Sequence, residues 1–188
     1  ITNAAGIAAG GLNPAGSVAI TEEFNLSTST ITNSTWASGG NLGTARGYVA
    51  MAGTQTAAIG AGGYTNPGNA RVANSEEYNG SAWSEGNDLN TARRSAVGIG
   101  IQTAALVVTG LDTGGTDTVN VESYNGTSWT EIANVNTGRR NTASAGTQTA
   151  GLIYGGNETT HALTESWNGT SWTEVGDLNT ARGELGGA

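Results

Sequence analysis

Two charged residue types recur at fixed places in a repeated motif of this chain. The arginines are Arg46, Arg93, Arg139 and Arg182. The glutamates, each two residues before an aromatic residue, are Glu22, Glu76, Glu122 and Glu165. A guanidinium group binds a carboxylate through two parallel hydrogen bonds. We expect each arginine to pair with a glutamate or carbonyl of a neighbouring unit and lock the fold. The alternative is a ring of four guanidinium groups that binds an anionic sugar or carboxylate.

Five further side chains in the variable segments complete the candidate ligand contacts: Tyr64, Arg71, Asp112, Asp117 and His161. Additional arginines at 94 and 140 directly follow two of the recurring ones. The two aspartates share a glycine-rich segment and offer oxygen ligands of the type that Ca²⁺ prefers, but the other ligands of a calcium loop are missing. A lone loop histidine is more often a solvated side chain than a ligand. We therefore predict no metal and no cofactor.

The composition argues against several classes of function. The net charge is −8 and all 7 basic residues are arginines, so no basic patch for nucleic acid is expected. No apolar stretch approaches the length of a membrane span, so no membrane insertion is expected. The chain has no cysteine, which removes disulfides and thiolate metal sites. Because no phosphate loop, zinc signature or catalytic triad is present, we predict that the protein is not an enzyme.

One motif of aromatic and turn residues recurs along the chain. It reads YNGSAW at 78–83, YNGTSW at 124–129 and WNGTSW at 167–172, and a stretched copy runs from Phe24 to Trp36. A second motif, GTQTA or GIQTA, recurs between these copies. Such a period indicates one supersecondary unit that is repeated. We predict a single domain, 1–188, with repeats at approximately 2–53, 54–100, 101–146 and 147–188.

Each repeat is predicted to contain four short strands. The first follows the arginine, as in 95–100, and the second is a continuous apolar run, as in 104–108, which is typical of a strand buried on both faces. The third alternates apolar and polar residues over 119–124. An Asn-Gly pair then predicts a type I′ hairpin, and the fourth strand, 128–132, carries a tryptophan.

The four-strand pattern resembles the kelch family of β-propellers, and the resemblance covers the whole chain. It rests on a double glycine after the second strand, an aromatic at the end of the third, and a tryptophan in the fourth. The residues that we expect to be structural on this basis are Gly62, Gly63, Gly155, Gly156, Tyr78, Tyr124, Trp36, Trp83, Trp129 and Trp172. The third repeat departs, since Thr109-Gly110 replaces the double glycine. The resemblance implies an all-β propeller with four-stranded antiparallel blades.

The phase of the repeats makes the two chain ends neighbours. Residues 183–188 occupy the position that 47–52 occupy in the next repeat. We therefore expect four blades, with the first completed by the C-terminal strand, which removes exposed sheet edges. The alternatives are an eight-bladed ring made by two chains and a segment of a larger propeller.

The repeats differ most in the connections between the second and third strands, where binding specificity usually lies. These connections are 12–21, 64–75, 111–121 and 157–164, and a further extension spans 25–35. We expect a non-catalytic binding or structural module that binds glycan or protein through these loops. Association of the chain with further copies of itself is a second expected interaction. Trp167 is an alternative platform for a sugar. A carbohydrate-active enzyme and a passive spacer are the alternative functions.

The sequence pattern NGTSWTE…LNTAR…GTQTA is similar to the kelch-like repeats of marine phage and bacterial proteins, several of which are virion appendage proteins. This resemblance implies a virion, phage tail fibre or extracellular setting.

Overall fold

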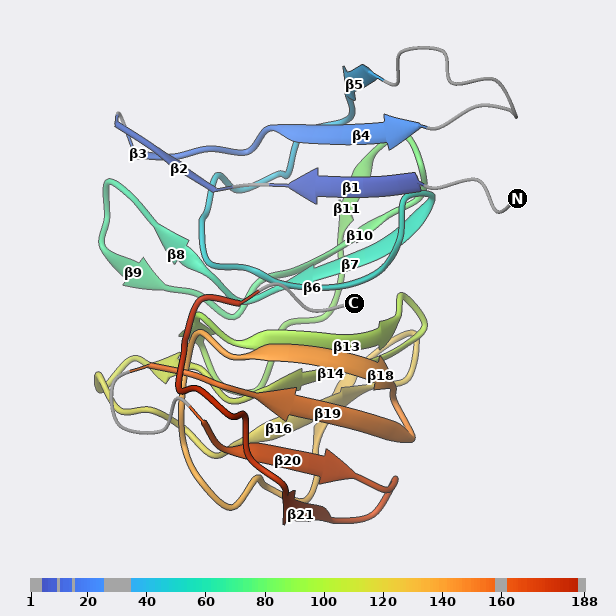
Figure 1. Ribbon diagram of the computed structural model, residues 1–188. Coiled ribbons are helices and arrows are strands. Elements are labelled where there is room, and N and C mark those ends of the chain that lie inside the picture. Colours follow the sequence, from blue (N-terminus) through green and yellow to red (C-terminus); the bar gives the residue numbers. More distant parts are fainter. Residues whose placement is uncertain (1–4, 10, 15, 26–34, 158–161, 186–188) are drawn as a thin grey trace.

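The structure is a computed structural model that describes residues 5–9, 11–14, 16–25, 35–157 and 162–185. Every regular element in these ranges is a β-strand (Figure 1). The same residues include no helix of the length and apolarity that a membrane crossing needs. The predicted all-β class is confirmed.

The longer strands form four antiparallel sheets of three or four strands, which we call blades 1 to 4 in chain order. Blade 1 contains β1 (Ala5–Ala9), β4 (Thr21–Asn25) and β5 (Thr35–Ser38). Blade 2 contains β6 (Ala50–Thr54), β7 (Ala57–Ala61), β10 (Ser75–Tyr78) and β11 (Trp83–Glu85). Blade 3 contains β13 (Val97–Ile101), β14 (Ala104–Val108), β16 (Val121–Tyr124) and β17 (Trp129–Glu131). Blade 4 contains β18 (Ala143–Thr147), β19 (Ala150–Tyr154), β20 (Thr164–Trp167) and β21 (Trp172–Val175).

Three small ribbons decorate one end of the blades. They are β2 (Leu12–Asn13) with β3 (Gly16–Ser17), β8 (Tyr64–Thr65) with β9 (Ala70–Arg71), and β12 (Arg93–Arg94) with β15 (Leu111–Asp112). The β2–β3 ribbon follows β1 of blade 1, the β8–β9 ribbon follows β7 of blade 2, and the β12–β15 ribbon joins the segment before blade 3 to the connection after β14. All three lie on the side opposite the turns between the first and second strands (Figure 1). We call this end of the molecule the loop face.

The core lies between blades, where apolar side chains of one sheet meet the aromatic pair of the next. Ile59 of β7 packs in one buried cluster with Tyr124 and Trp129 of blade 3. Leu106 of β14 packs in the equivalent cluster with the Trp167–Trp172 pair of blade 4. The second strands of blades 2 and 3, β7 and β14, are continuous apolar runs because they are covered on both sides.

The Asn-Gly hairpins differ from the predicted type I′ turn. Only the glycine has a positive φ, as in Gly80 at +89°, whereas Asn79 is outside the left-handed region. The loop has four residues between the paired Tyr78 and Trp83. The Asn79 Oδ1 atom accepts hydrogen bonds from the backbone N–H groups of Ser81 and Ala82, at 3.0 Å each. The asparagine is selected by this side-chain bond to its own turn rather than by a positive φ.

The residue after the second strand is left-handed in blades 2, 3 and 4. Gly62 has a φ of +67° and Gly155 one of +70°. Thr109, which departs from the double-glycine pattern, adopts the same conformation at +61° and is fully buried. Its Oγ1 donates to the carbonyl of Val108 at 2.7 Å. The fold at this point is therefore imposed by the surrounding packing even where the residue is unfavourable for it.

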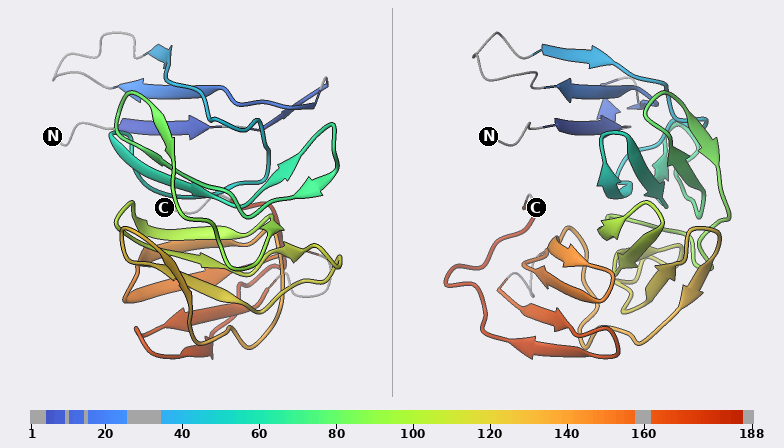
Figure 2. Two further views of the ribbon diagram at one scale, coloured as in Figure 1. Left: turned by 180° about the vertical axis from the view of Figure 1, so that it is seen from behind. Right: turned by 90° about the vertical axis from the view of Figure 1, so that its right-hand side faces the viewer.

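The blades are arranged as an open arc, with blades 1 and 4 at its two ends (Figure 2). The first strands β6, β13 and β18 line the concave side. The expected closing strand, 183–188, is described only to residue 185, and within the described residues it makes no hydrogen bond with β1. Glu184 donates its backbone N–H to the Asn141 carbonyl at 3.0 Å, so this segment lies beside the start of β18, just as Asn141 lies beside Ser95 and Ser95 beside Tyr48.

Neighbouring blades approach one another closely at Gly98 in β13. A Cβ atom at this position would stand 2.3 Å from the backbone oxygen of Met51 in β6. The Gly98 carbonyl in turn accepts a hydrogen bond from Ser144 Oγ of β18, at 2.8 Å. This glycine therefore sets the spacing of three successive first strands.

We expect Gly98→Ala to lower the free energy of unfolding by about 1–3 kcal/mol, because the added methyl group forces blades 2 and 3 apart. Chemical denaturation measures this difference. Gly176→Ala is the matched control, since a Cβ there meets no atom within 4 Å, and its effect should stay within about 0.5 kcal/mol. Equal stability of the two variants would show that Gly98 does not set the blade spacing.

Candidate functional site

The recurring arginines and glutamates meet at the junctions between blades. At the blade 3–4 junction, Arg139 Nη2 lies 3.0 Å from Glu165 Oε1, and both side chains are buried. Arg139 Nη1 donates to the Leu163 carbonyl at 2.6 Å. The backbone N–H of Asn136 donates to Glu165 Oε2 at 2.8 Å and that of Thr137 to Oε1 at 3.4 Å. We call this arrangement of arginine, glutamate and two N–H groups the clasp.

The clasp recurs at every junction inside the arc. Arg46 pairs with Glu76 at 3.2 Å between blades 1 and 2, and Arg93 pairs with Glu122 between blades 2 and 3. All three arginines have no exposed surface. Burial lowers their pKa from the ordinary value, and the facing glutamate opposes that shift. The locking role that we expected therefore fits these positions, and an anion-binding ring does not, because no ligand can reach them.

Arg182 is placed differently from the other three. It is exposed, and within the described part of the chain no carboxylate pairs with it. Its backbone oxygen still accepts the Gly156 N–H at 3.2 Å, as the Arg139 oxygen accepts the Gly110 N–H at 2.9 Å. The backbone of the clasp is thus present at this end, without the glutamate of a following blade.

A second polar contact accompanies the clasp on the opposite side of the junction. Gln102 Nε2 of blade 3 donates to the carbonyls of Ala58 and Tyr78 in blade 2, at 3.1 and 2.8 Å. Gln148 of blade 4 does the same toward Ala105 and Tyr124 of blade 3. The glutamine of the recurrent GTQTA motif therefore joins successive blades, which explains why the motif recurs.

We expect Glu122→Gln to lower the free energy of unfolding by about 3 kcal/mol, because it leaves the buried Arg93 charge uncompensated. Urea denaturation measures the loss. Glu131→Gln, on the neighbouring outer strand and exposed, should change stability by less than about 0.5 kcal/mol. A loss no larger than that of the control would contradict the structural role of the clasp.

Two tyrosines at the junctions between blades have a raised pKa. Tyr124 donates its hydroxyl to Glu77 of the preceding blade, and Tyr78 likewise donates to Glu23. Burial and the carboxylate neighbour together raise the pKa of Tyr124 and of Tyr78 above the ordinary value of 10.0. Since the folded-state pKa lies above the unfolded one, this contribution to stability is complete below about pH 10 and is lost as pH rises through the folded-state pKa.

The loss of stability between about pH 9 and pH 12 should accordingly be smaller in Tyr124→Phe than in the wild type, since the variant has no proton to lose there. Thermal unfolding followed by circular dichroism across this range tests the difference. The exposed Tyr48→Phe is the control and should keep the wild-type slope. Parallel curves for Tyr124→Phe and the wild type would contradict the assignment.

The loop face carries a cationic and aromatic cluster between blades 2 and 3. The Arg94 guanidinium carbon lies 4.6 Å from the ring centroid of Tyr64 and 5.4 Å from that of Tyr48. The Tyr64 hydroxyl donates to Asn69 Oδ1 at 2.6 Å, which orients the ring. Arg71 pairs with Tyr64 across the β8–β9 ribbon, so the two side chains share one face of it. We call Tyr48, Tyr64, Arg71 and Arg94 the Tyr–Arg patch.

The charges of the Tyr–Arg patch are not neutralised locally. Among the described residues, neither Arg71 nor Arg94 forms an ion pair, and the Nε atoms of both are buried without a hydrogen-bond partner. Tyr48 is 47% exposed and has a φ of +56°, a left-handed conformation that is rare for an aromatic residue. Ser95, Asn141 and Glu184 have the same φ in the later repeats, so this conformation belongs to the scaffold, and at Tyr48 it presents an aromatic ring.

The other predicted site residues do not join this patch. The Asp112 side chain accepts the Thr116 N–H at 2.9 Å and closes its own loop. Asp117 pairs with Arg140 at 2.6 Å, with both side chains partly exposed. His161 lies outside the described residues. Within the described part of the chain no three metal-ligating side chains gather in one place.

The sequence predicts structural tryptophans in the fourth strands and, as an alternative, a sugar platform at Trp167. Trp129 and Trp172 are buried, at 6% exposure each, and pack between blades. The Trp36 side chain lies outside the described residues. Trp167 is also buried, at 4% exposure, and its Nε1 donates to the Gln148 carbonyl at 2.8 Å. It packs in the core and is not the sugar platform that its replacement of tyrosine suggested.

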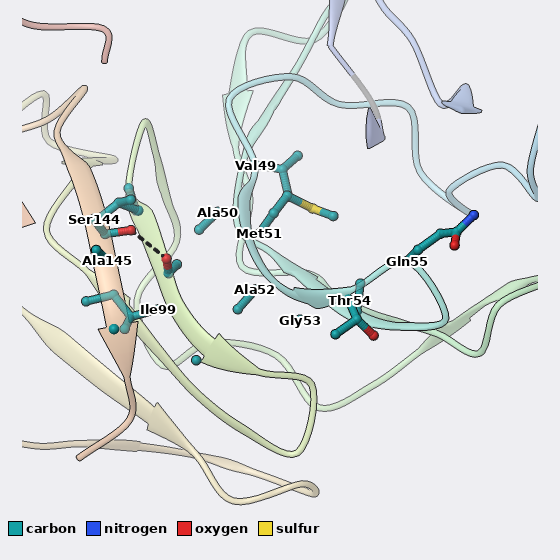
Figure 3. A pocket seen from close by; sticks show the side chains of 16 residues that line it. Val49, Ala50, Met51, Ala52, Gly53, Thr54, Gln55, Ile99, Ser144 and Ala145 are labelled. Atoms are coloured by element: carbon teal, nitrogen blue, oxygen red, sulfur yellow. Dashed lines mark hydrogen bonds between the residues drawn. The ribbon is translucent and has the colours of Figure 1, made fainter. Parts of the chain in front are cut away.

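A groove runs along the concave side of the first strands (Figure 3). Its volume is about 470 Å³, and it is lined by small residues of β6, β13 and β18, among them Ala52 and Ser144. Val49 and Ala96, which follow Tyr48 and Ser95 in the chain, stand in its wall. The groove therefore begins beside the Tyr–Arg patch.

Sequence reasoning noted Arg94 only as an additional arginine and did not identify Tyr48. The doublet Arg93-Arg94 was the available signal, since the first arginine is committed to the clasp and the second is free to face outward. Tyr48 carries no such signal, because the corresponding residues are Ser95, Asn141 and Glu184. Only the chain path brings it beside Arg94.

Comparison with known proteins gives the fold alone. The sequence matches no protein-family model and no curated protein. Among solved structures, YjhT, a kelch-repeat β-propeller protein, superposes with a TM-score of 0.69 at 10% sequence identity. The match covers 93% of this chain and 66% of that one. The propeller architecture is therefore supported by structure.

Proposed function

We propose that this protein is a non-catalytic binding module that recognises carboxylate-bearing glycans through the Tyr–Arg patch. The observation that carries the proposal is the position of Arg94 over the Tyr48 and Tyr64 rings, with Arg71 beside them. Both arginines lack an ion-pair partner among the described residues, although the chain as a whole carries a net charge of −8.

The chemistry of the patch suits an acidic sugar. Tyrosine rings offer an apolar face to the C–H groups of a pyranose and a polar hydroxyl to its edges. A guanidinium group accepts a carboxylate in a bidentate geometry, which gives both charge and orientation. Stacking on the rings limits the motion of Arg94, so less side-chain entropy is lost when a ligand binds.

The setting in which we place this activity is a virion appendage, a phage tail fibre or another extracellular surface protein. That placement rests on the resemblance of the repeat wording to such proteins. The chemistry of the patch is compatible with it, because acidic polysaccharides on cell surfaces present many carboxylates, and many weak contacts together give tight binding.

Glycan-array binding tests the proposal. We expect the wild type to bind uronate- or sialate-bearing glycans, with Tyr64→Ala and Arg94→Ala each weakening binding on the order of tenfold. Arg140→Ala is the matched control, since that arginine pairs with Asp117 outside the patch, and its binding should equal that of the wild type.

Three results would overturn the proposal. Binding that is unchanged in both patch variants would place the ligand site elsewhere. Release of reducing sugar from a bound polysaccharide would identify the alternative, a carbohydrate-active enzyme. A folded wild-type protein that binds no acidic glycan would favour a passive spacer.

A further inference from the structure

At each junction inside the arc, the clasp combines an arginine that follows one blade with a glutamate of the next blade. One end of the arc has such a glutamate and the other end has such an arginine. Glu22 in β4 stands where Glu76, Glu122 and Glu165 stand in the later blades, but it is exposed. Arg182 stands where the three buried arginines stand and is exposed as well. Within the described residues neither has an ion-pair partner. One clasp is thus divided between the two ends of the molecule.

The outer face of blade 4 is apolar where the next blade would cover it. Leu152 of β19 is 38% exposed, whereas its counterparts Ile59 and Leu106 are 2% and 0% exposed. Val175 is 41% exposed, while its counterpart Ile132 packs against the core cluster of blades 3 and 4. Interior blades bury these positions under the aromatic pair of the following blade. We call Leu152, Val175 and Arg182 the tail surface.

Blade 1 offers the complementary surface. Phe24 of β4 and Trp36 of β5 are cross-strand partners, as Tyr124 and Trp129 are in blade 3. Thr21, beside Glu22, is buried and accepts a hydrogen bond from Trp83 Nε1 of blade 2 at 2.9 Å, so β4 is held rigidly from its inner side. We call the side of blade 1 that carries Glu22 the head surface.

The identities of the paired residues also match across the missing junction. Glu23 and Glu77 are each followed, one blade later, by a tyrosine that donates to them. At the position of these two glutamates, blade 3 has Ser123, and the aromatic residue of the following blade is Trp167, which has no hydroxyl group to donate. Blade 4 also has a serine there, Ser166, and the aromatic residue of blade 1 is Phe24, which likewise has no hydroxyl group. The tail surface therefore suits blade 1 by the same rule that the interior junctions follow.

We propose that the tail surface binds the head surface of a second copy of this chain, with Arg182 of one copy paired to Glu22 of the other. The N–H groups of Asn179 and Thr180 are in the positions that donate to the glutamate in the interior clasps. The new junction thus repeats, between molecules, the contact that already holds three pairs of blades together.

A second copy fits better than closure within one chain. Blades 1 and 4 lie at opposite ends of the arc (Figure 2). The angle between successive blades is fixed by backbone contacts such as that of Gly98 with Met51 and by the clasps themselves. Closing the arc on itself would have to bend all three junctions, whereas association of two copies leaves them nearly unchanged. The contact is head-to-tail, so it closes into a ring or continues as a chain.

Sedimentation velocity over a series of concentrations tests the proposal on the full chain. The wild type is expected to associate, and Arg182→Glu and Glu22→Arg are each expected to weaken association by at least tenfold, because each sets like charges against one another. Both residues are exposed in the single molecule, so each variant should stay folded by circular dichroism. Glu131→Arg is the control. Glu131 lies in β17, the outermost strand of blade 3, away from both proposed surfaces, so this variant should associate like the wild type.

The decisive arm is an equimolar mixture of the two charge-reversal variants. In a mixed pair, one junction has the reversed charges and the other has the original ones, so both are matched and association should return. Four results would overturn the proposal: a wild type that is monomeric at every concentration, single variants that associate like the wild type, a mixture that stays monomeric, and a Glu131→Arg variant as weak as the others.

Discussion

The buried pair of arginine and glutamate between blades is the interaction on which the rest of this structure depends. Removing two charges from water costs several kcal/mol for each ion, so the pair is stable only where further hydrogen bonds satisfy it. Here the glutamate accepts hydrogen bonds from two backbone N–H groups, and the guanidinium donates hydrogen bonds to backbone carbonyls of the next blade. The arginine Nε atoms are the part left without partners. The requirement for all these groups at once fixes where one blade stands relative to the next.

The same interaction explains which parts of the fold could be predicted. A clasp that must be rebuilt at each junction forces its residues to recur, so the strand order, the structural tryptophan and the locking role of Arg93 could all be read from the repeats. The curvature of the arc could not, since it depends on contacts such as that of Gly98 with a backbone oxygen. The turn at Asn79 was predicted in the right place with the wrong geometry, because its side-chain bond stabilises a longer loop than a positive φ would.

The candidate site was predictable only in part. Tyr64 and Arg71 were predicted from the variability of their segment, whereas Arg94 was noted only as the neighbour of a recurring arginine. Recurrence in this chain marks residues that build the scaffold, and a residue that contacts a ligand need not recur. Tyr48 appears in one blade only, and its neighbours in space, Tyr64 and Arg94, come from segments 16 and 46 residues further along the chain. No local pattern reports such a meeting.

One feature of the backbone gives this scaffold a fixed set of display positions. The residues two places after each recurring arginine, Tyr48, Ser95, Asn141 and Glu184, all have a φ of +56°. Their backbones are joined in sequence by N–H to carbonyl bonds of 3.0–3.1 Å from one blade to the next. The main chain there is constant while an aromatic, a hydroxyl, an amide and a carboxylate group are presented in turn. Selection can therefore change the chemistry around the axis one side chain at a time, without altering the path of the chain that holds it.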